Sequence, residues 1–215
     1  MIIEGLEQRS PEWMTMRNGC VTGSRVADVC AKLKKGGPAA CRQNYLIEVA
    51  VSRLTGLAPD RFVTPAMQWG IDNEQFARAA YEMQADCMVE SIGFAIHPRL
   101  DFFGASPDGL IGKDGVLELK CPTSDTHLGY ILGGVLPLYY MPQMLAEMAC
   151  TERQWCDFVS FDPRMPKNLQ LFVRRFQRDD ELITALEVEV AAFLLEVDAL
   201  LEQIEQASPC LLNAG

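Results

Sequence analysis

The chain has 215 residues, 49% of them apolar, so it can bury a complete core, and its length allows one large domain or two small ones. No apolar run is long enough for a bilayer-spanning helix, and the first residues lack the pattern of a secretory signal. We therefore expect a cytoplasmic protein with no membrane partner. With a formal net charge of −10, the protein cannot have a surface that is positively charged on all sides and attracts phosphate everywhere.

Helices are predicted for most of the first third of the chain. They are a short helix from Ser10, a second from a cap at Thr22 or Ser24 to about 32, a third over about 41–55, and a fourth from Pro65 to about 83. The fourth helix carries Glu74 and is expected to place Trp69, Phe76 and Tyr81 on an apolar face. The basic stretch 32–38 between the second and third helices is either a contact to a phosphate backbone or a solubilising connector.

Strands and helices alternate in the part of the chain that follows. Strands are predicted at about 88–96, 100–105, 116–121, 155–161 and 168–176, and helical segments at about 126–133 and 138–150. No internal repeat or low-complexity linker separates these elements, and we predict one domain over 1–215, with a core at about 10–176.

The last predicted element is a long amphipathic helix over about 179–206. Its apolar residues recur at spacings of three and four, Asp179 and Asp180 suit its first turn, and it would be roughly 40 Å long. This segment holds nine acidic and no basic side chains, whereas residues 1–60 hold eight basic and six acidic ones. We interpret it as a helix that covers the core with its acids outward, and a partner-binding helix is the alternative.

The segment 106–121 carries the most informative pattern. One apolar residue separates Glu118 from Lys120, so a strand directs both side chains to the same face. A predicted turn at 114–115 folds this strand back on the segment that carries Asp108. Two carboxylates and an amine can then act together on a phosphodiester, as oxygen ligands for Mg²⁺ and as a cation that orients the attacking water. A solvated surface pair is the alternative interpretation.

Several motifs occur in an order that resembles one family over about residues 10–176. They are Trp13-x-x-x-Arg17-x-Gly19-x-x-Thr22-x-Ser24; Ala66-Met67-Gln68-Trp69-Gly70 followed by Glu74; Ser106-Pro107-Asp108-Gly109-Leu110 with Leu117-Glu118-Leu119-Lys120-Cys121-Pro122; Leu132-Gly133-Gly134 with Tyr140-Met141-Pro142-Gln143; and Phe161-Asp162-Pro163-Arg164-Met165. The chain thereby resembles the phage lambda exonuclease family, which comprises the YqaJ-like viral recombinase nucleases of the PD-(D/E)xK superfamily.

The resemblance implies an α/β fold of the restriction-endonuclease type, with a central mixed sheet flanked by helices and the long C-terminal helix added to it. The implied activity is a Mg²⁺-dependent 5′-to-3′ double-stranded DNA exonuclease, with Mn²⁺ as a substitute metal. It releases mononucleotides and leaves a 3′ single strand for phage-type recombination by annealing. The implied partners are duplex DNA ends, two further copies of the chain in a homotrimeric ring, and a single-strand annealing protein. The implied location is the cytoplasm of a bacterial host.

The resemblance also assigns roles to residues of the central pattern. Asp108 and Glu118 are the implied Mg²⁺ ligands, together with the main-chain carbonyl of Leu119. Lys120 is implied to orient the water nucleophile and to stabilise the charge that develops on the phosphate. The same site is implied to include two residues on helices: Glu74, which holds metal-bound waters or a second ion, and Gln143, which hydrogen-bonds within the site.

Substrate recognition is implied at the amino-terminal motifs. A pocket for a 5′-terminal phosphate would draw on an arginine fork and two hydroxyl groups, namely Arg17, Ser24 and Ser106. Family members can carry an arginine where this chain has residues 123–125, so the pocket is weaker, is differently built, or has Asp125 turned away. Met67 occupies the position of an apolar wedge between terminal base pairs, and a core methionine is the alternative.

Two other functions are weighed against this one. A restriction-type or repair endonuclease could use the same core, and a DNA-end-binding subunit could keep a vestigial site. Eight scattered cysteines without a Cys-x-x-Cys motif predict free thiols, and His97 and His127 are each predicted to lie at the surface or to have a satisfied structural role, which argues against a zinc or iron–sulfur site.

Overall fold

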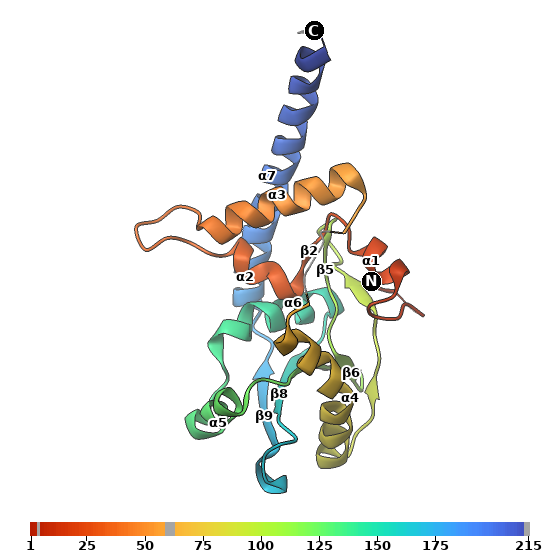
Figure 1. The fold of residues 1–215 in the computed structure, drawn as a ribbon, viewed down its shortest axis with the longest axis vertical. Coiled ribbons are helices and arrows are strands. Elements are labelled where there is room, and N and C mark those ends of the chain that lie inside the picture. Colours follow the sequence, from red (N-terminus) through yellow and green to blue (C-terminus); the bar gives the residue numbers. More distant parts are fainter. Residues whose placement is uncertain (4, 59–62, 213–215) are drawn as a thin grey trace.

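The computed structural model describes residues 1–3, 5–58 and 63–212, with side chains as far as residue 207. Its larger sheet has five strands in the order β3-β6-β7-β8-β9. Three of them, β6, β8 and β9, are labelled in Figure 1. The bounds of the five strands are Val89–Glu90, Gly109–Ile111, Gly115–Lys120, Trp155–Phe161 and Leu171–Gln177. β7 and β8 run parallel and the other pairs antiparallel, so the sheet is mixed and the predicted α/β architecture is confirmed.

A second sheet of four short strands, in the order β1-β4-β5-β2, was not predicted. Its strands are Ile2–Ile3, Phe94–Ile96, Phe103–Ala105 and Val21–Thr22. The strand predicted at 88–96 divides between the two sheets, because β3 ends at Glu90 and β4 begins at Phe94. Gly93 lies in the break, where an added Cβ would be 2.2 Å from the carbonyl oxygen of Leu6, so the chain needs glycine there.

Seven α-helices and three 3₁₀ helices are described. The α-helices are α1 Pro11–Met16, α2 Val26–Val29, α3 Ala40–Thr55, α4 Pro65–Ala85, α5 Ser124–Gly133, α6 Met141–Thr151 and α7 Asp180–Leu212. The 3₁₀ helices are η1 Gly23–Arg25, η2 Leu138–Tyr140 and η3 Lys167–Leu169. None of the helices in the described ranges is long and apolar enough to cross a membrane.

Two hydrophobic clusters position the helices. α6 packs against both sheets and α7, and α3 packs on α7, in the larger cluster. The smaller cluster lies beneath α4, where Tyr81 meets Leu117 and Leu119 of β7. The two leucines therefore face α4, as the alternation in β7 predicts, and Glu118 points to the opposite face.

Two details of the predicted helices are wrong. The second helix was expected to continue to about 32, but η1 and the short α2 replace it, and Lys32 already pairs with Pro38 across the basic loop. On α4, Phe76 is 56% exposed whereas Tyr81 is 2% exposed. Five residues turn about 500° around a helix axis, which is one full turn plus about 140°. The two side chains therefore point in different directions and cannot share a narrow apolar stripe.

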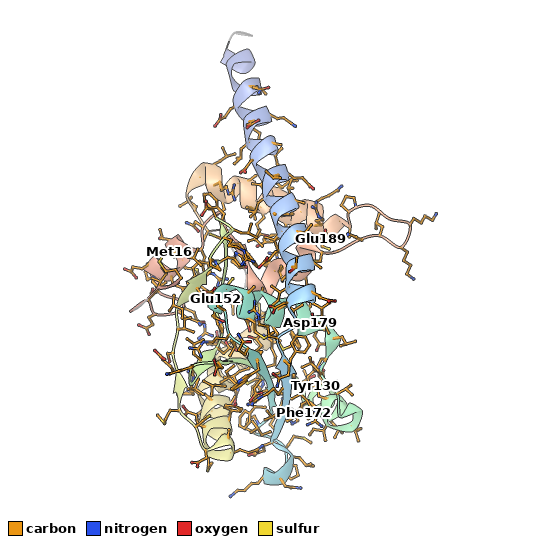
Figure 2. The ribbon with its side chains drawn as sticks, turned by 180° about the vertical axis from the view of Figure 1, so that it is seen from behind. Met16, Tyr130, Glu152, Phe172, Asp179 and Glu189 are labelled. Atoms are coloured by element: carbon orange, nitrogen blue, oxygen red, sulfur yellow. The ribbon has the colours of Figure 1, made fainter. Side chains whose placement is uncertain are left out.

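The C-terminal helix begins where the sequence predicts and extends further. Asp179 caps it, because its carboxylate accepts the main-chain N–H groups of Glu181 and Leu182 at 3.0 Å. Figure 2 shows Asp179 at the start of α7 and Glu189 further along the same helix. Val190 and Phe193 are fully buried, so this part of α7 covers the core as interpreted, while the far end of the helix projects past the body (Figure 1).

No acid of α7 within the described side chains is buried, as predicted, but several of these acids pair with basic residues, which reduces the predicted separation of charge. Ion pairs join three of them to the basic residues of the first 60 residues: Arg42 to Glu196 at 2.6 Å, Arg53 to Asp198 at 2.6 Å and Lys32 to Glu189 at 2.5 Å. Glu187 also contacts Arg99 and His97. Opposite charges of the two segments therefore partly neutralise one another, which weakens the predicted separation of charge.

Candidate active site

The β6–β7 hairpin brings Asp108 and Glu118 together. Asp108 immediately precedes β6, and its N–H donates to the carbonyl of Leu117 at 3.1 Å. Its carboxylate accepts the N–H of Leu119 at 2.6 Å, which fixes the side chain beside the central part of β7. The predicted turn and the predicted convergence of the two carboxylates are thus present in the structure.

Lys120 contacts the carboxylate of Glu118 from the same face of β7. Glu118 is 1% exposed and the Lys120 side chain is 25% exposed, so this is a largely buried pair and not the solvated surface pair of the alternative interpretation. The Lys120 amine also lies 5.0 Å from the centre of the Tyr140 ring. A lysine held this way presents its charge to a ligand without a large rearrangement.

Gln143 reaches the same carboxylate from α6. Its amide nitrogen donates to Glu118 Oε1 at 2.6 Å and to Glu147 Oε1 at 2.9 Å. Gln143 and Glu147 are four residues apart on α6, so they occupy one face of the helix, which points toward β7. The structure thus brings Gln143 into the predicted site and adds Glu147 to it.

The cluster holds more negative charge than its lysine can balance. Burial, and next the charge of Glu118, raise the pKa of Asp108 well above its ordinary value. The same two causes, in the same order, raise the pKa of Glu147 well above the usual range. Burial alone would lower the pKa of Lys120, but the carboxylates of Glu118 and Asp108 outweigh it and raise that pKa. Such a site favours an added cation.

Glu74 lies at the edge of this cluster on α4. Its carboxylate is paired with the guanidinium of Arg9, and its charge contributes to the raised pKa of Asp108. It is therefore close enough to act on the cluster electrostatically. Arg9, which the sequence analysis did not identify, holds it in place.

The donor atoms of the cluster suit a hard divalent cation. Asp108, Glu118 and the main-chain carbonyl of Leu119 offer oxygen only, which is the ligand type that Mg²⁺ prefers, and Mg²⁺ keeps several waters of its own. Within the described residues, no group of three or more His, Cys, Asp or Glu side chains is placed so that it could hold a metal ion by itself. The arrangement fits an open site with few protein ligands better than a structural metal centre.

The residues predicted to bind a terminal phosphate gather at the edge of the smaller sheet. Arg17 Nη1 donates to Ser106 Oγ at 2.8 Å, and the Arg17 guanidinium lies 4.0 Å from the centre of the Trp13 ring. Trp13 Nε1 also donates to Ser106 Oγ, at 3.0 Å. Thr22 and Gly104 lie opposite one another on the parallel strands β2 and β5. Ser24 comes two residues after Thr22 and Ser106 two residues after Gly104, so both serines lie at the same end of these strands.

A cavity of about 520 Å³ adjoins these residues. Its lining includes Trp13, Arg17, Tyr45 and Met67 but not Asp108, Glu118 or Lys120, so the carboxylate cluster lies outside the cavity. Met67 is 48% exposed, which excludes the core methionine of the alternative interpretation. Its role as a wedge stays a prediction.

Besides Arg9, sequence reasoning missed two residues of the site. Trp13 was recognised as part of a motif without a role, and Glu147 was not identified. Each lies four positions, or about one helical turn, from a predicted site residue: Trp13 from Arg17, and Glu147 from Gln143. This spacing was the available signal. Asp125 lies exposed on the first turn of α5, so the carboxylate that raised doubt about the phosphate pocket faces solvent.

The remaining predicted residues have structural roles. The cysteines of the described ranges are free thiols, with Cys150 and Cys156 buried and Cys41 exposed. His127 is buried, and its Nε2 donates to the carbonyl of Leu169 at 2.8 Å. His97 Nε2 lies 3.0 Å from the carboxylate of Glu187, which ties the turn after β4 to α7.

Comparisons with known proteins agree with this arrangement. The YqaJ-like viral recombinase domain matches residues 12–154. Two crystal structures of the alkaline exonuclease LHK-Exo from Laribacter hongkongensis, one of them in complex with dAMP, superimpose on this chain with TM-scores of 0.87 and 0.88. LHK-Exo is 45% identical in sequence to this chain, and the match covers 94% of this chain and 100% of LHK-Exo. A phage related exonuclease from Haemophilus somnus 129PT has the same fold, with a TM-score of 0.65 and 17% identity over 88% of this chain and 99% of that chain.

A viral relative extends the comparison. Uncharacterized protein R354 of Acanthamoeba polyphaga mimivirus is 25% identical over 170 residues, which is 73% of this chain, and the match spans only 29% of the length of that viral protein. The family match over residues 12–154 contains the whole hairpin with Asp108, Glu118 and Lys120 as well as Gln143. With the 45% identity to LHK-Exo along nearly the full chain, this confirms the resemblance drawn from the motifs, and the chain belongs to the YqaJ-like viral recombinase family.

Proposed function

We propose that this protein is a Mg²⁺-dependent exonuclease that digests duplex DNA from its 5′ ends, releases mononucleotides and leaves a 3′ single strand for recombination by annealing. The observation that carries the proposal is the cluster of Asp108, Lys120 and Gln143 around the buried carboxylate of Glu118, beside the Arg17–Ser106 pair. Its similarity to an alkaline exonuclease supports nuclease chemistry on this cluster. The cytoplasm of a bacterial host is the compartment that this role requires.

Asp108, Glu118 and the carbonyl of Leu119 would hold Mg²⁺, with Mn²⁺ as a substitute, and Glu74 would hold waters of the ion or a second ion. When bound, the metal supplies Lewis-acid polarisation of the phosphate and a water of lowered pKa. Excess negative charge and an all-oxygen donor set support this assignment.

The protein's own groups prepare the reaction. The N–H of Leu119 fixes the Asp108 carboxylate, and Gln143 with Lys120 fixes that of Glu118. Lys120 orients the attacking water and stabilises the charge that develops on the phosphate oxygens, because its amine is already desolvated and aligned before substrate binds.

Recognition of the DNA end falls to the neighbouring edge. Arg17 and the hydroxyl groups of Ser24 and Ser106 would bind the 5′-terminal phosphate, and Met67 at the rim of the cavity would part the terminal base pair. The contact from Arg17 to Ser106 at 2.8 Å and the exposure of Met67 support these roles. An arginine fork gives stronger and more directional phosphate binding than a lysine would.

Digestion of matched DNA substrates tests the proposal. In Mg²⁺ we expect linear 5′-phosphorylated duplex to be degraded to mononucleotides, with the 3′-labelled strand persisting, and closed circular duplex to be spared. Chelation of the metal should stop the reaction, because the buried carboxylates then lack their cation. Cleavage of closed circles would favour the endonuclease alternative, and binding of ends without cleavage would favour the vestigial one.

We also propose that three copies form a ring around the DNA and that a single-strand annealing protein takes up the product strand. Enclosure would hold an acidic chain on a polyanion, although the ion pairs between α7 and the first segment weaken charge separation as a support for it. Light scattering should report three times the 23.9 kDa mass of the chain. A monomer at micromolar concentration that leaves its DNA after each cut would contradict the ring.

A further inference from the structure

Glu147 is a buried acid that the proposed mechanism does not use. It is 1% exposed, on the face of α6 that points to β7. Its Oε1 accepts one N–H of Gln143 at 2.9 Å, while the same amide nitrogen donates to Glu118 Oε1 at 2.6 Å. A chain of hydrogen bonds therefore connects Glu147 to the carboxylate of Glu118.

Packing does not explain why an acid lies at this position. Its neighbours on α6, Met144 and Met148, are fully buried and apolar, as expected for a helix inside the core. In the described part of the chain no basic side chain forms an ion pair with Glu147, and the nearby Lys120 pairs with Glu118. A buried carboxyl group without a cation destabilises a fold, and an apolar residue of similar shape is often neutral or stabilising.

We propose that Glu147 is a positioning residue that orients the amide of Gln143, and through it the carboxylate of Glu118. An amide can present either its N–H groups or its oxygen to a neighbour, and only the N–H groups stabilise a carboxylate. Because Glu147 accepts the second N–H, the nitrogen stays turned toward Glu118. Without that acceptor the amide is free to rotate and present its oxygen to Lys120 instead. The inference rests on the proposed function, in which Glu118 binds the metal.

Three variants separate this role from packing. Glu147→Leu removes the acceptor at similar volume, Glu147→Gln keeps an acceptor oxygen without the charge, and Met148→Leu changes the same buried helix without touching the chain of hydrogen bonds. For Glu147→Leu we expect a melting temperature near that of the parent, Mn²⁺ binding weakened about tenfold in calorimetry without DNA, and kcat lowered about tenfold with an unchanged KM for DNA. Glu147→Gln should recover most of both losses, and Met148→Leu should behave like the parent.

The inference is overturned if folded Glu147→Leu binds Mn²⁺ and cleaves DNA like the parent, or if Glu147→Gln is as impaired as Glu147→Leu. Should Glu147→Leu not fold, Glu147→Met lacks the acceptor as well and takes its place. Failure of the proposed function can be told apart from failure of this inference, because a parent protein that does not cleave DNA refutes the proposed nuclease activity. The Mn²⁺ affinities of the variants still decide the role of Glu147.

Discussion

Replacement of Lys120 by alanine should lower the rate of DNA cleavage at least about a hundredfold, as expected when one electrostatic group is removed from a preorganised site. The amine contacts the nearly fully buried carboxylate of Glu118, so its charge acts in a region that water screens weakly. Glu118→Ala should have an effect of the same size, because it removes a metal ligand and the partner of both Lys120 and Gln143. Both losses should appear on 5′-phosphate and 5′-hydroxyl DNA alike.

Circular dichroism and a nuclease assay on the same samples check this result. Lys113→Ala is the matched control, because Lys113 is exposed in the turn between β6 and β7 on the same hairpin. It should cleave DNA like the parent. A folded Lys120→Ala protein with normal activity would refute the mechanism, and an unfolded one would require Lys120→Met, which keeps the length of the side chain.

Replacement of Arg17 by alanine should reduce cleavage of 5′-phosphorylated duplex by about tenfold or more, and cleavage of 5′-hydroxyl duplex much less. A charge-assisted hydrogen bond to phosphate contributes about 1.5–3 kcal/mol, and only the phosphorylated end has that group to lose. Arg17 is held toward the predicted pocket by Ser106 and by stacking on Trp13. Initial rates on the two duplexes, measured side by side, give the ratio.

Arg99→Ala provides the control for loss of one positive charge, since Arg99 is 68% exposed and pairs with Glu187 of α7, outside the predicted site. It should leave the ratio between the two substrates unchanged. Equal losses on both ends after Arg17→Ala would instead make Arg17 a structural residue or a general backbone contact.

Local sequence patterns determined the central part of the site. The turn at 114–115 and the alternation around Glu118 act over a few residues, so they fix the hairpin that joins Asp108 to β7 whatever surrounds it. Asp179 fixes the start of α7 in the same way, through bonds to the next turn of the chain. For these features the sequence contained the physical cause.

Only the tertiary structure decided features that depend on distant partners. Residues 88–96 form two strands because they belong to two different sheets. A periodic pattern within these nine residues cannot show that division. The acids of α7 meet Arg42 and Arg53 because α3 packs on that helix, and composition by segment cannot show such pairing. Glu147 joins the site because α6 lies over β7. Its position four residues after Gln143 was visible in the sequence, but burial beside Glu118 comes from packing alone.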